Sequence, residues 1–290
     1  MSEFIYHYTD KAGRDGICDD NNVWFKLTSK SRNDDEDTSY IRTVLKKIKL
    51  DDNYFNNKAL EVMQSVLNPV GFEKCNSYIT KNIFMFCVME NTDDKTGRSL
   101  HDTSKDVFRI QIDKKKLMSF LINNKEFNQY GTFVFGNMIY DKDTQEKRIK
   151  DIFFTYQNLY EVYCGGGKGI FINNYHGSTP ANDYTGISGN IPFFVDQKWC
   201  SKDWSCYSQE QKKEIDNMWV GIANEFYKIS TFIKKCKFEN ENEFRFAYLR
   251  NQKDKENITL NSYFSIEIKI PRECIISNIC IGKGTNKKMR

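Results

Sequence analysis

The chain has 290 residues, of which 39 % are hydrophobic and 14 % aromatic, so composition excludes a chain that is disordered throughout. Its 43 basic and 39 acidic residues leave a net charge of +4. That charge is too small to indicate nucleic-acid binding by itself, because dedicated nucleic-acid binders show a clustered basic face.

The nine cysteines are an odd number without a CxxC pair, and the three histidines lie far apart in sequence. This pattern favours free thiols in a reducing compartment and gives no set of ligands for a metal. The N-terminus lacks a basic segment followed by an apolar run, and no apolar stretch approaches the ~20 residues of a membrane span. We therefore expect one soluble, cytoplasmic domain over residues 1–290 that binds no metal and no membrane.

The first half of the chain alternates strand and helix patterns. Period-two or continuous apolar runs predict strands at 4–9, 23–27, 82–89, 107–112, 132–140 and 151–156. Helical spacing predicts helices at 11–18, 40–50, 59–66 and 114–123, with polar loops at 29–37 and 91–106.

The second half begins with a Gly, Ser, Thr and Asn loop at 173–190. The longest helical pattern then covers 208–234, and strands are expected at 238–249, 263–270 and 275–281, of which the last is expected to be buried. Strands at both ends with helices mostly between them favour an α+β fold, in which the two ends of the chain meet in a central sheet.

The first candidate site is the N-terminal strand. In a strand, His7 and Thr9 point to one face while Tyr6 and Tyr8 point to the other. A histidine beside a hydroxyl can hydrogen-bond a sugar or an amide. The alternative is a core histidine whose ring is satisfied by a backbone carbonyl.

Two further segments carry groups of polar side chains that are candidates for a functional site. Asn33 and Asp34 favour a turn, for which a solvated loop is the alternative. If 238–249 is one strand, period two places four charged residues on one face: Glu239, Glu241, Glu243 and Arg245. Carboxylates held this close can have one pKa raised, which suits acid or base catalysis, and the alternative is a set of exposed edge-strand charges.

Five segments occur in a characteristic order between positions 4 and 284: FIYHYTD, VWFKL, RNDDE, FENENEFRF and IISNICIGKG. In this order they resemble the bacterial domain-of-unknown-function 2971 family. That family often has a Ser-Phe-Ser strand in the middle, whereas this chain has Phe84-Met85-Phe86-Cys87.

The same layout is similar to the ADP-ribosyltransferase fold, which implies a split central β-sheet with flanking helices. The resemblance further implies that NAD is the substrate and that ADP-ribose passes to a protein or nucleic-acid acceptor. The kind of protein that the resemblance implies is a bacterial toxin, effector or defence enzyme. An NAD glycohydrolase and a catalytically inactive binding module of the same fold are the alternatives.

The resemblance also assigns roles to residues. Glu243 would be the catalytic carboxylate, and Glu241 would orient the acceptor. His7 would bind the adenine-side ribose, and the backbone at Tyr8 would clamp the nicotinamide amide. The other expected NAD contacts are Thr9, Asn33, Asp34 and Arg245, and the aromatic that stacks on nicotinamide is one of Phe84, Phe86, Tyr156 and Tyr163. These roles require His7 and Glu243 to line one cleft on adjacent strands.

Overall fold

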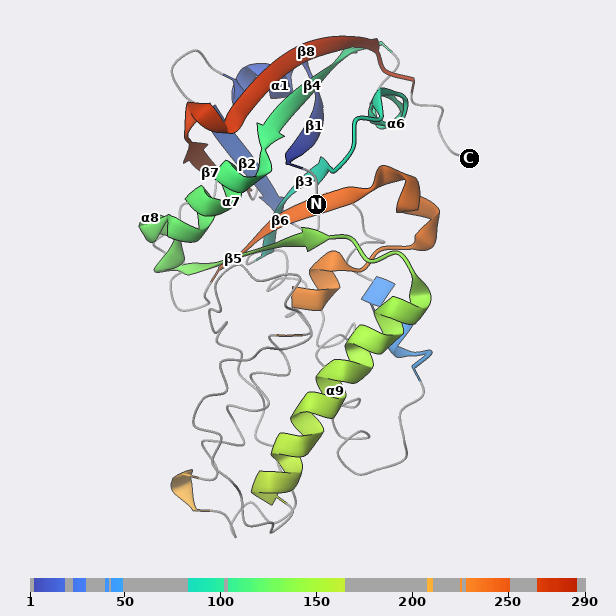
Figure 1. Ribbon diagram of the computed structural model, residues 1–290, viewed down its shortest axis with the longest axis vertical. Helices are drawn as coiled ribbons and strands as arrows, with labels where there is room; N and C mark the ends of the chain where they lie inside the picture. The colour runs from blue at the N-terminus through green and yellow to red at the C-terminus, as the bar shows by residue number, and fades with distance from the viewer. Residues whose placement is uncertain are drawn as a thin grey trace.

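The apolar and period-two patterns of the sequence form a mixed α+β fold around one antiparallel sheet, shown in the computed structural model of Figure 1. The structure describes residues 3–18, 23–29, 40–41, 43–48, 83–101, 104–164, 208–210, 225, 228–250 and 265–285. The strands are β1 (Phe4–Asp10), β2 (Val23–Ser29), β3 (Ile83–Met89), β4 (Asp106–Asp113), β5 (Gly131–Asn137), β6 (Glu243–Arg250), β7 (Ser265–Ile270) and β8 (Ile275–Lys283). The helices are α1 (Lys11–Ile17), α6 (Asp94–Ser99), α7 (Lys114–Asn123), α8 (Lys125–Asn128) and α9 (Lys142–Cys164), with 3₁₀ turns η4 (Cys236–Glu241) and η6 (Arg272–Cys274).

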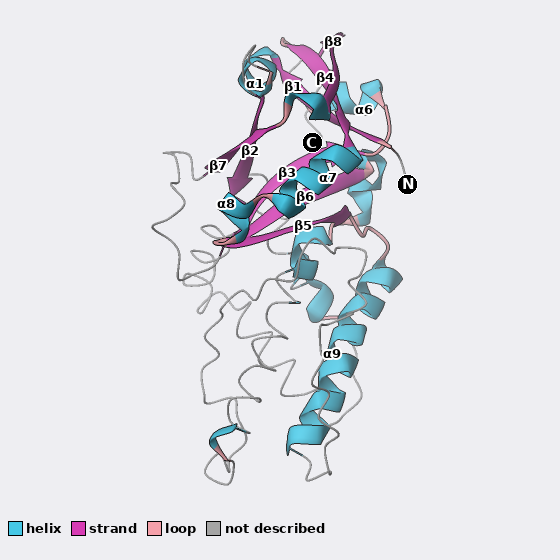
Figure 2. Ribbon diagram, turned by 60° about the vertical axis from the view of Figure 1, so that its left-hand side comes forward, coloured by secondary structure: helices cyan, strands magenta, loops and turns pink. Residues whose placement is uncertain are grey.

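The sheet forks at β3. Its main order is β5-β6-β3-β1-β4-β8, while β2 pairs with β3 and carries β7. β1 meets β3 only through Tyr6 opposite Met89, and β2 meets β3 through Thr28 opposite Met85 and Ser29 opposite Phe84. Two branches, β1-β4-β8 and β2-β7, therefore leave the same edge of β3 at its two ends, and Figure 2 shows them diverging.

The main hydrophobic core lies on the face of β3 that carries Phe84, Phe86 and Val88. Side chains from both branches meet these residues there, among them Ile110 of β4 and Ile268 of β7. Leu117 and Leu121 of α7 complete the core, so this helix is held by one apolar stripe. The core joins the two branches even though they share no strand pairing among the described residues.

Aspartates cap the N-termini of α1, α6 and α7. Asp10 caps α1 by accepting the Gly13 N–H at 2.9 Å, and Asp113 caps α7 by accepting the Lys116 N–H at 3.0 Å. Asp93 caps α6 by accepting the N–H groups of Lys95 and Thr96. Each cap satisfies backbone donors that the first helical turn leaves without a partner.

Most expected elements are confirmed in kind, and four predictions are wrong. The range 151–156 lies inside α9 instead of forming a strand, and α6 occupies part of the expected loop at 91–106. The expected strand at 238–249 begins only at Glu243, because residues 236–241 form η4. β8 is mostly exposed at the edge of the sheet rather than buried.

Several predictions fall outside the described residues, namely the loop at 29–37 apart from Ser29, the helix at 59–66, the loop at 173–190 and most of the helix at 208–234. Within the described part of the chain, no helix is long and apolar enough to cross a membrane.

Candidate functional site

His7 occupies the fork of the sheet. Cys87 lies between Met85, which pairs with β2, and Met89, which pairs with β1. In the described strand pairings, Cys87 stands opposite Arg245 of β6 and opposite no residue of β1 or β2. The Nδ1 atom of His7 lies 3.1 Å from this carbonyl oxygen, and its ring packs on Phe86 with the centroids 4.5 Å apart. The contact matches the alternative of a core histidine satisfied by a backbone carbonyl.

Burial lowers the pKa of His7 to about 4, more than the hydrogen bond to Cys87 raises it. The ring is therefore neutral at pH 7, with its proton on Nδ1 to donate to the carbonyl. A neutral ring wedged between two strands supports the fork.

The register places His7 and Glu243 on opposite faces of the sheet. Tyr6 stands opposite Met89, and Met89 stands opposite Glu243, so these three side chains share one face. His7 follows Tyr6 and points to the other face, where it meets Phe86. The expectation that His7 and Glu243 line one cleft on adjacent strands is wrong on both counts, because β3 also lies between β1 and β6.

Glu243 is the centre of a buried group of charges. It begins β6, and its residue is 6 % exposed. Arg245 grips its carboxylate with two donors, Nε at 2.5 Å from Oε1 and Nη2 at 3.2 Å from Oε2. Lys234 adds its Nζ at 2.9 Å from Oε2.

Period two explains the contact between Glu243 and Arg245, since residues two apart in a strand share a face. The expected shared face is confirmed for this pair, and the positive charge of Arg245 lies against the Glu243 carboxylate.

The charges around Glu243 decide its ionisation. Burial alone would raise the pKa of Glu243, but the positive charges of Arg245 and Lys234 outweigh burial and lower it to about 2. The carboxylate is thus ionised at every physiological pH. Burial raises the pKa of the neighbouring Cys87 thiol well above its usual range, and the charge of Glu243 adds to this, so Cys87 stays protonated and donates to Glu243.

Glu241 lies close to Glu243, but not because the two residues share a strand face. Glu239 and Glu241 belong to η4, and Asn242 then turns the chain in the left-handed region with φ 42°. The predicted single strand face for all three glutamates is therefore wrong. Lys234 nevertheless brings two of them together, because its Nζ lies 2.6 Å from Oε2 of Glu241 as well as close to Glu243.

The two carboxylates differ in their ionisation. Burial raises the pKa of Glu241, although the charge of Lys234 opposes this shift. Glu243 therefore stays ionised, whereas Glu241 takes up a proton at a higher pH than Glu243 does. Such a difference between neighbouring carboxylates is typical of paired acid and base groups.

Hydrogen bonds to neighbouring segments fix this cluster. The Glu243 N–H donates to the Tyr140 hydroxyl at 3.1 Å, and the Glu243 carbonyl accepts from the Met138 N–H at 2.9 Å. The Arg245 Nη1 donates to the carbonyl of Thr231 at 3.0 Å. The cluster therefore joins β6 to the segment 228–235, which carries Thr231 and Lys234.

The remaining expected NAD contacts are not gathered at this cluster. The Tyr8 hydroxyl donates to Asp94 at 3.2 Å, and its backbone carbonyl accepts a hydrogen bond from His101. Thr9 is buried beside α1, against Gly13. Asn33 and Asp34 lie outside the described residues, as do the side chains of Tyr156 and Tyr163.

Three residues of the cluster were not predicted from the sequence: Lys234, Tyr140 and Cys87. Each lies in a different segment, and the sheet and the segment 228–235 bring them to Glu243. Lys234 stands in the run Lys234-Lys235, yet its side chain is only 11 % exposed. The 9-residue separation from Glu243 gives no periodic signal that links the two.

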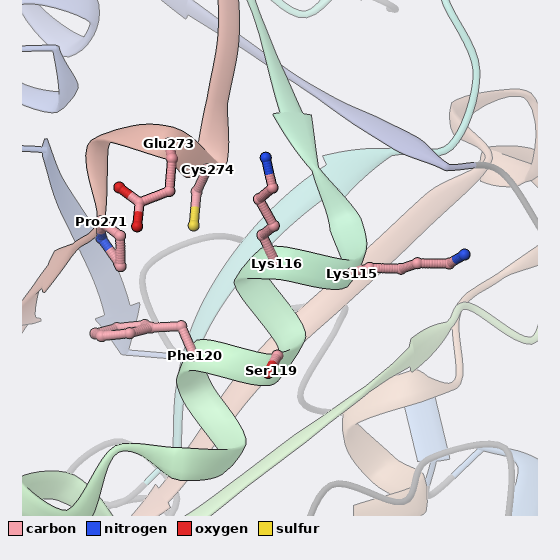
Figure 3. A pocket seen from close by; sticks show the side chains of 7 residues that line it. All are labelled: Lys115, Lys116, Ser119, Phe120, Pro271, Glu273 and Cys274. Carbon is pink, nitrogen blue, oxygen red and sulfur yellow. The ribbon is translucent and has the colours of Figure 1, made fainter.

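A surface pocket of about 520 Å³ lies elsewhere, between α7 and η6. Its lining residues, shown in Figure 3, are Lys115, Lys116, Ser119, Phe120, Pro271, Glu273 and Cys274. Burial raises the pKa of the Cys274 thiol to about 11, so this cysteine is not a nucleophile at pH 7. The pocket shares no residue with the Glu243 cluster, and the figure shows Lys115 pointing away from Glu273 and Cys274.

Comparisons with protein-family models, with curated proteins and with solved structures gave no match. Among the residues that the structure describes, no group of three or more His, Cys, Asp and Glu side chains could hold a metal ion.

Proposed function

We propose that this protein cleaves NAD at the bond between nicotinamide and ribose and transfers ADP-ribose to a protein or nucleic-acid acceptor. The observation that carries the proposal is the pair of carboxylates, Glu241 and Glu243, held around the single ammonium group of Lys234. The Glu243 carboxylate is ionised at physiological pH, and Glu241 has a raised pKa.

One feature of the sheet agrees with the resemblance, although His7 and Glu243 lie on opposite faces of that sheet. β1, β3 and β6 are consecutive in the sheet, and the sheet opens between β1 and β3. A split central sheet is part of what the resemblance implies.

The chemistry uses the negative charge of Glu243. When the bond between nicotinamide and C1′ breaks, nicotinamide leaves with the electron pair and C1′ becomes cationic, as in glycoside hydrolysis. A preorganised carboxylate stabilises that charge as it develops, and removing such a group costs about 2.7 to 4 kcal/mol of barrier. Glu243 can serve in this way without accepting a proton.

Glu241 completes the reaction at the acceptor. In the proposal, a nucleophile of the acceptor forms the new bond to C1′ and releases its proton toward the Glu241 carboxylate. A carboxylate with a raised pKa is better matched to this proton than one with a pKa of about 2. His7 takes no part in these steps, because it lies on the other face and supports the fork.

The burial of the cluster favours a second function, a binding module of the same fold without catalysis. Both oxygens of Glu243 already accept hydrogen bonds from Arg245 or Lys234, and the side chain is 7 % exposed. A substrate ribose would have to share these oxygens with the two cations.

A product assay separates the functions. The protein is incubated with NAD that is labelled in its ADP-ribose part, together with candidate protein and nucleic-acid acceptors. Label on a macromolecule supports transfer, and free labelled ADP-ribose supports an NAD glycohydrolase. Intact NAD after long incubation contradicts both reactions, and a measurable Kd for NAD under those conditions supports the binding module.

A further inference from the structure

We infer that Lys234 is the positioning residue of the carboxylate pair, and that it holds Glu241 where an acceptor is activated; this inference rests on the proposed function. Its ammonium lies 2.6 Å from Glu241 and 2.9 Å from Glu243. The side chain is 11 % exposed, so solvent screens these contacts weakly.

The backbone of Lys234 is fixed by a buried glutamine. The Gln145 side chain donates to the Lys234 carbonyl at 2.8 Å and to the Ile139 carbonyl at 2.6 Å, and Gln145 is 0 % exposed. The Tyr40 hydroxyl donates to the other end of the same amide at 3.2 Å. The Lys234 N–H also donates to Ile139 at 3.2 Å, so the lysine stem starts from a rigid point.

The turn that carries Glu241 is less well fixed. η4 has no side-chain hydrogen bond at its N-terminal cap, and Asn242 leaves it in a left-handed conformation that side chains rarely adopt. The ammonium of Lys234 also lies over the Phe238 ring of this turn, 4.8 Å from its centroid. Lys234 therefore holds η4 through both a carboxylate and an aromatic ring.

The two carboxylates depend on Lys234 to different extents. Glu243 keeps the two-donor contact with Arg245 when Lys234 is removed, whereas Glu241 loses a partner at 2.6 Å. The other titratable groups that face this centre are Tyr140 and Cys87, which are both neutral at pH 7. Loss of the ammonium should therefore displace Glu241 and raise its pKa further, while leaving Glu243 in place.

The test compares Lys234→Met with Lys115→Met, a control in which an exposed lysine of α7 is removed far from the Glu243 cluster. Carboxyl ¹³C resonances of glutamate are titrated by NMR in both variants. We expect the pKa of Glu241 to rise in Lys234→Met and to stay unchanged in Lys115→Met. In turnover, the ratio of transferred to hydrolysed ADP-ribose should fall about tenfold to a hundredfold in Lys234→Met, because a misplaced group costs rate in that range.

Two further variants keep the inference falsifiable. Lys234→Arg retains the charge and should restore most of the transfer ratio, and Lys234→Gln keeps donors without charge if Lys234→Met does not fold. An unchanged Glu241 pKa together with an unchanged transfer ratio would overturn the inference. Absence of NAD turnover in the unaltered protein would sink the proposed function instead, and the NMR titration would still decide the role of Lys234.

Discussion

Glu243 stays ionised because two cations compensate for its burial, and this makes its charge a source of stability. Its pKa is about 2 in the folded protein and 4.5 in its ordinary state. Stability from this group is fully present above pH 4.5 and is lost as the pH falls toward 2. The shift corresponds to about 3 kcal/mol.

Urea unfolding at several pH values between 6 and 2 measures this contribution. We expect Glu243→Gln to be less stable than the unaltered protein at pH 6, since it leaves Arg245 buried without its partner. The variant should also lose less stability between pH 4.5 and 2. Glu239→Gln, which changes an exposed glutamate of η4, should retain the original slope. Parallel pH profiles for all three proteins would refute this account of Glu243.

His7 gives a second pH dependence in a different window. Its pKa falls from 6.5 to about 4 on folding, so the unfolded chain binds a proton that the folded protein refuses. Stability should be full above pH 6.5 and decline as the pH falls toward 4. In His7→Gln, an amide donor can reach the Cys87 carbonyl without titrating, so the decline between pH 6.5 and 4 should be smaller. Thermal unfolding at half-unit pH steps detects the difference. Identical stability profiles for the two proteins would contradict a neutral His7 ring between the strands.

The packing of α6 against β1 predicts a large effect from one methyl group. A Cβ atom at Gly97 would overlap the ring of Tyr8, which is buried and whose hydroxyl is hydrogen-bonded to Asp94. Gly97→Ala should therefore destabilise the protein by about 1 to 3 kcal/mol. Gly16→Ala in α1 is the matched control, since nothing lies within 4 Å of its added Cβ. Alanine is the better helix former, so Gly16→Ala should be neutral or stabilising by up to about 1 kcal/mol in chemical unfolding. Equal effects of the two changes would rule out this packing.

The turn between η4 and β6 depends on Asn242. Its φ of 42° is accessible to asparagine and glycine and costs other residues about 1 to 2 kcal/mol. Asn242→Ala should lower the free energy of unfolding by about 1 kcal/mol, while Asn242→Gly should be tolerated. Asn240→Ala, an exposed change inside η4, should have little effect. If alanine at both positions is equally harmless, the left-handed turn does not determine where β6 begins.

Local sequence patterns predicted helices and strands correctly where the hydrophobic period agrees with the place of the residues in the fold. The period of 238–249 identified β6 but could not show that its first residues turn away, because a left-handed Asn242 has no signature in hydrophobicity. The apolar run Ile152-Phe153-Phe154 suggested a strand, yet it lies within α9, where only part of it is buried. Short apolar runs fit either element, and here the length of the surrounding helix decided.

The forked sheet explains which parts of the candidate site the sequence could reveal. Glu241, Glu243 and Arg245 are close in the chain, so their proximity was predictable. Lys234 and Tyr140 reach the cluster through the tertiary fold, and no spacing rule links them to β6. The faces of β1 and β6 are set by the register across β3, which is why the sequence placed His7 wrongly beside Glu243.

If the ionised carboxylate of Glu243 stabilises a ribose cation, as proposed, the substitution Glu243→Asp should slow the cleavage of NAD. Aspartate keeps the charge but withdraws it by one methylene, while Glu239→Asp makes the same change at an exposed position of η4. The measurement is the initial rate of nicotinamide release from NAD by each folded variant. We predict that Glu243→Asp lowers this rate by about a hundredfold or more, as expected for loss of a preorganised electrostatic group, and that Glu239→Asp leaves it unchanged. Equal rates in the unaltered protein and Glu243→Asp would contradict the claim.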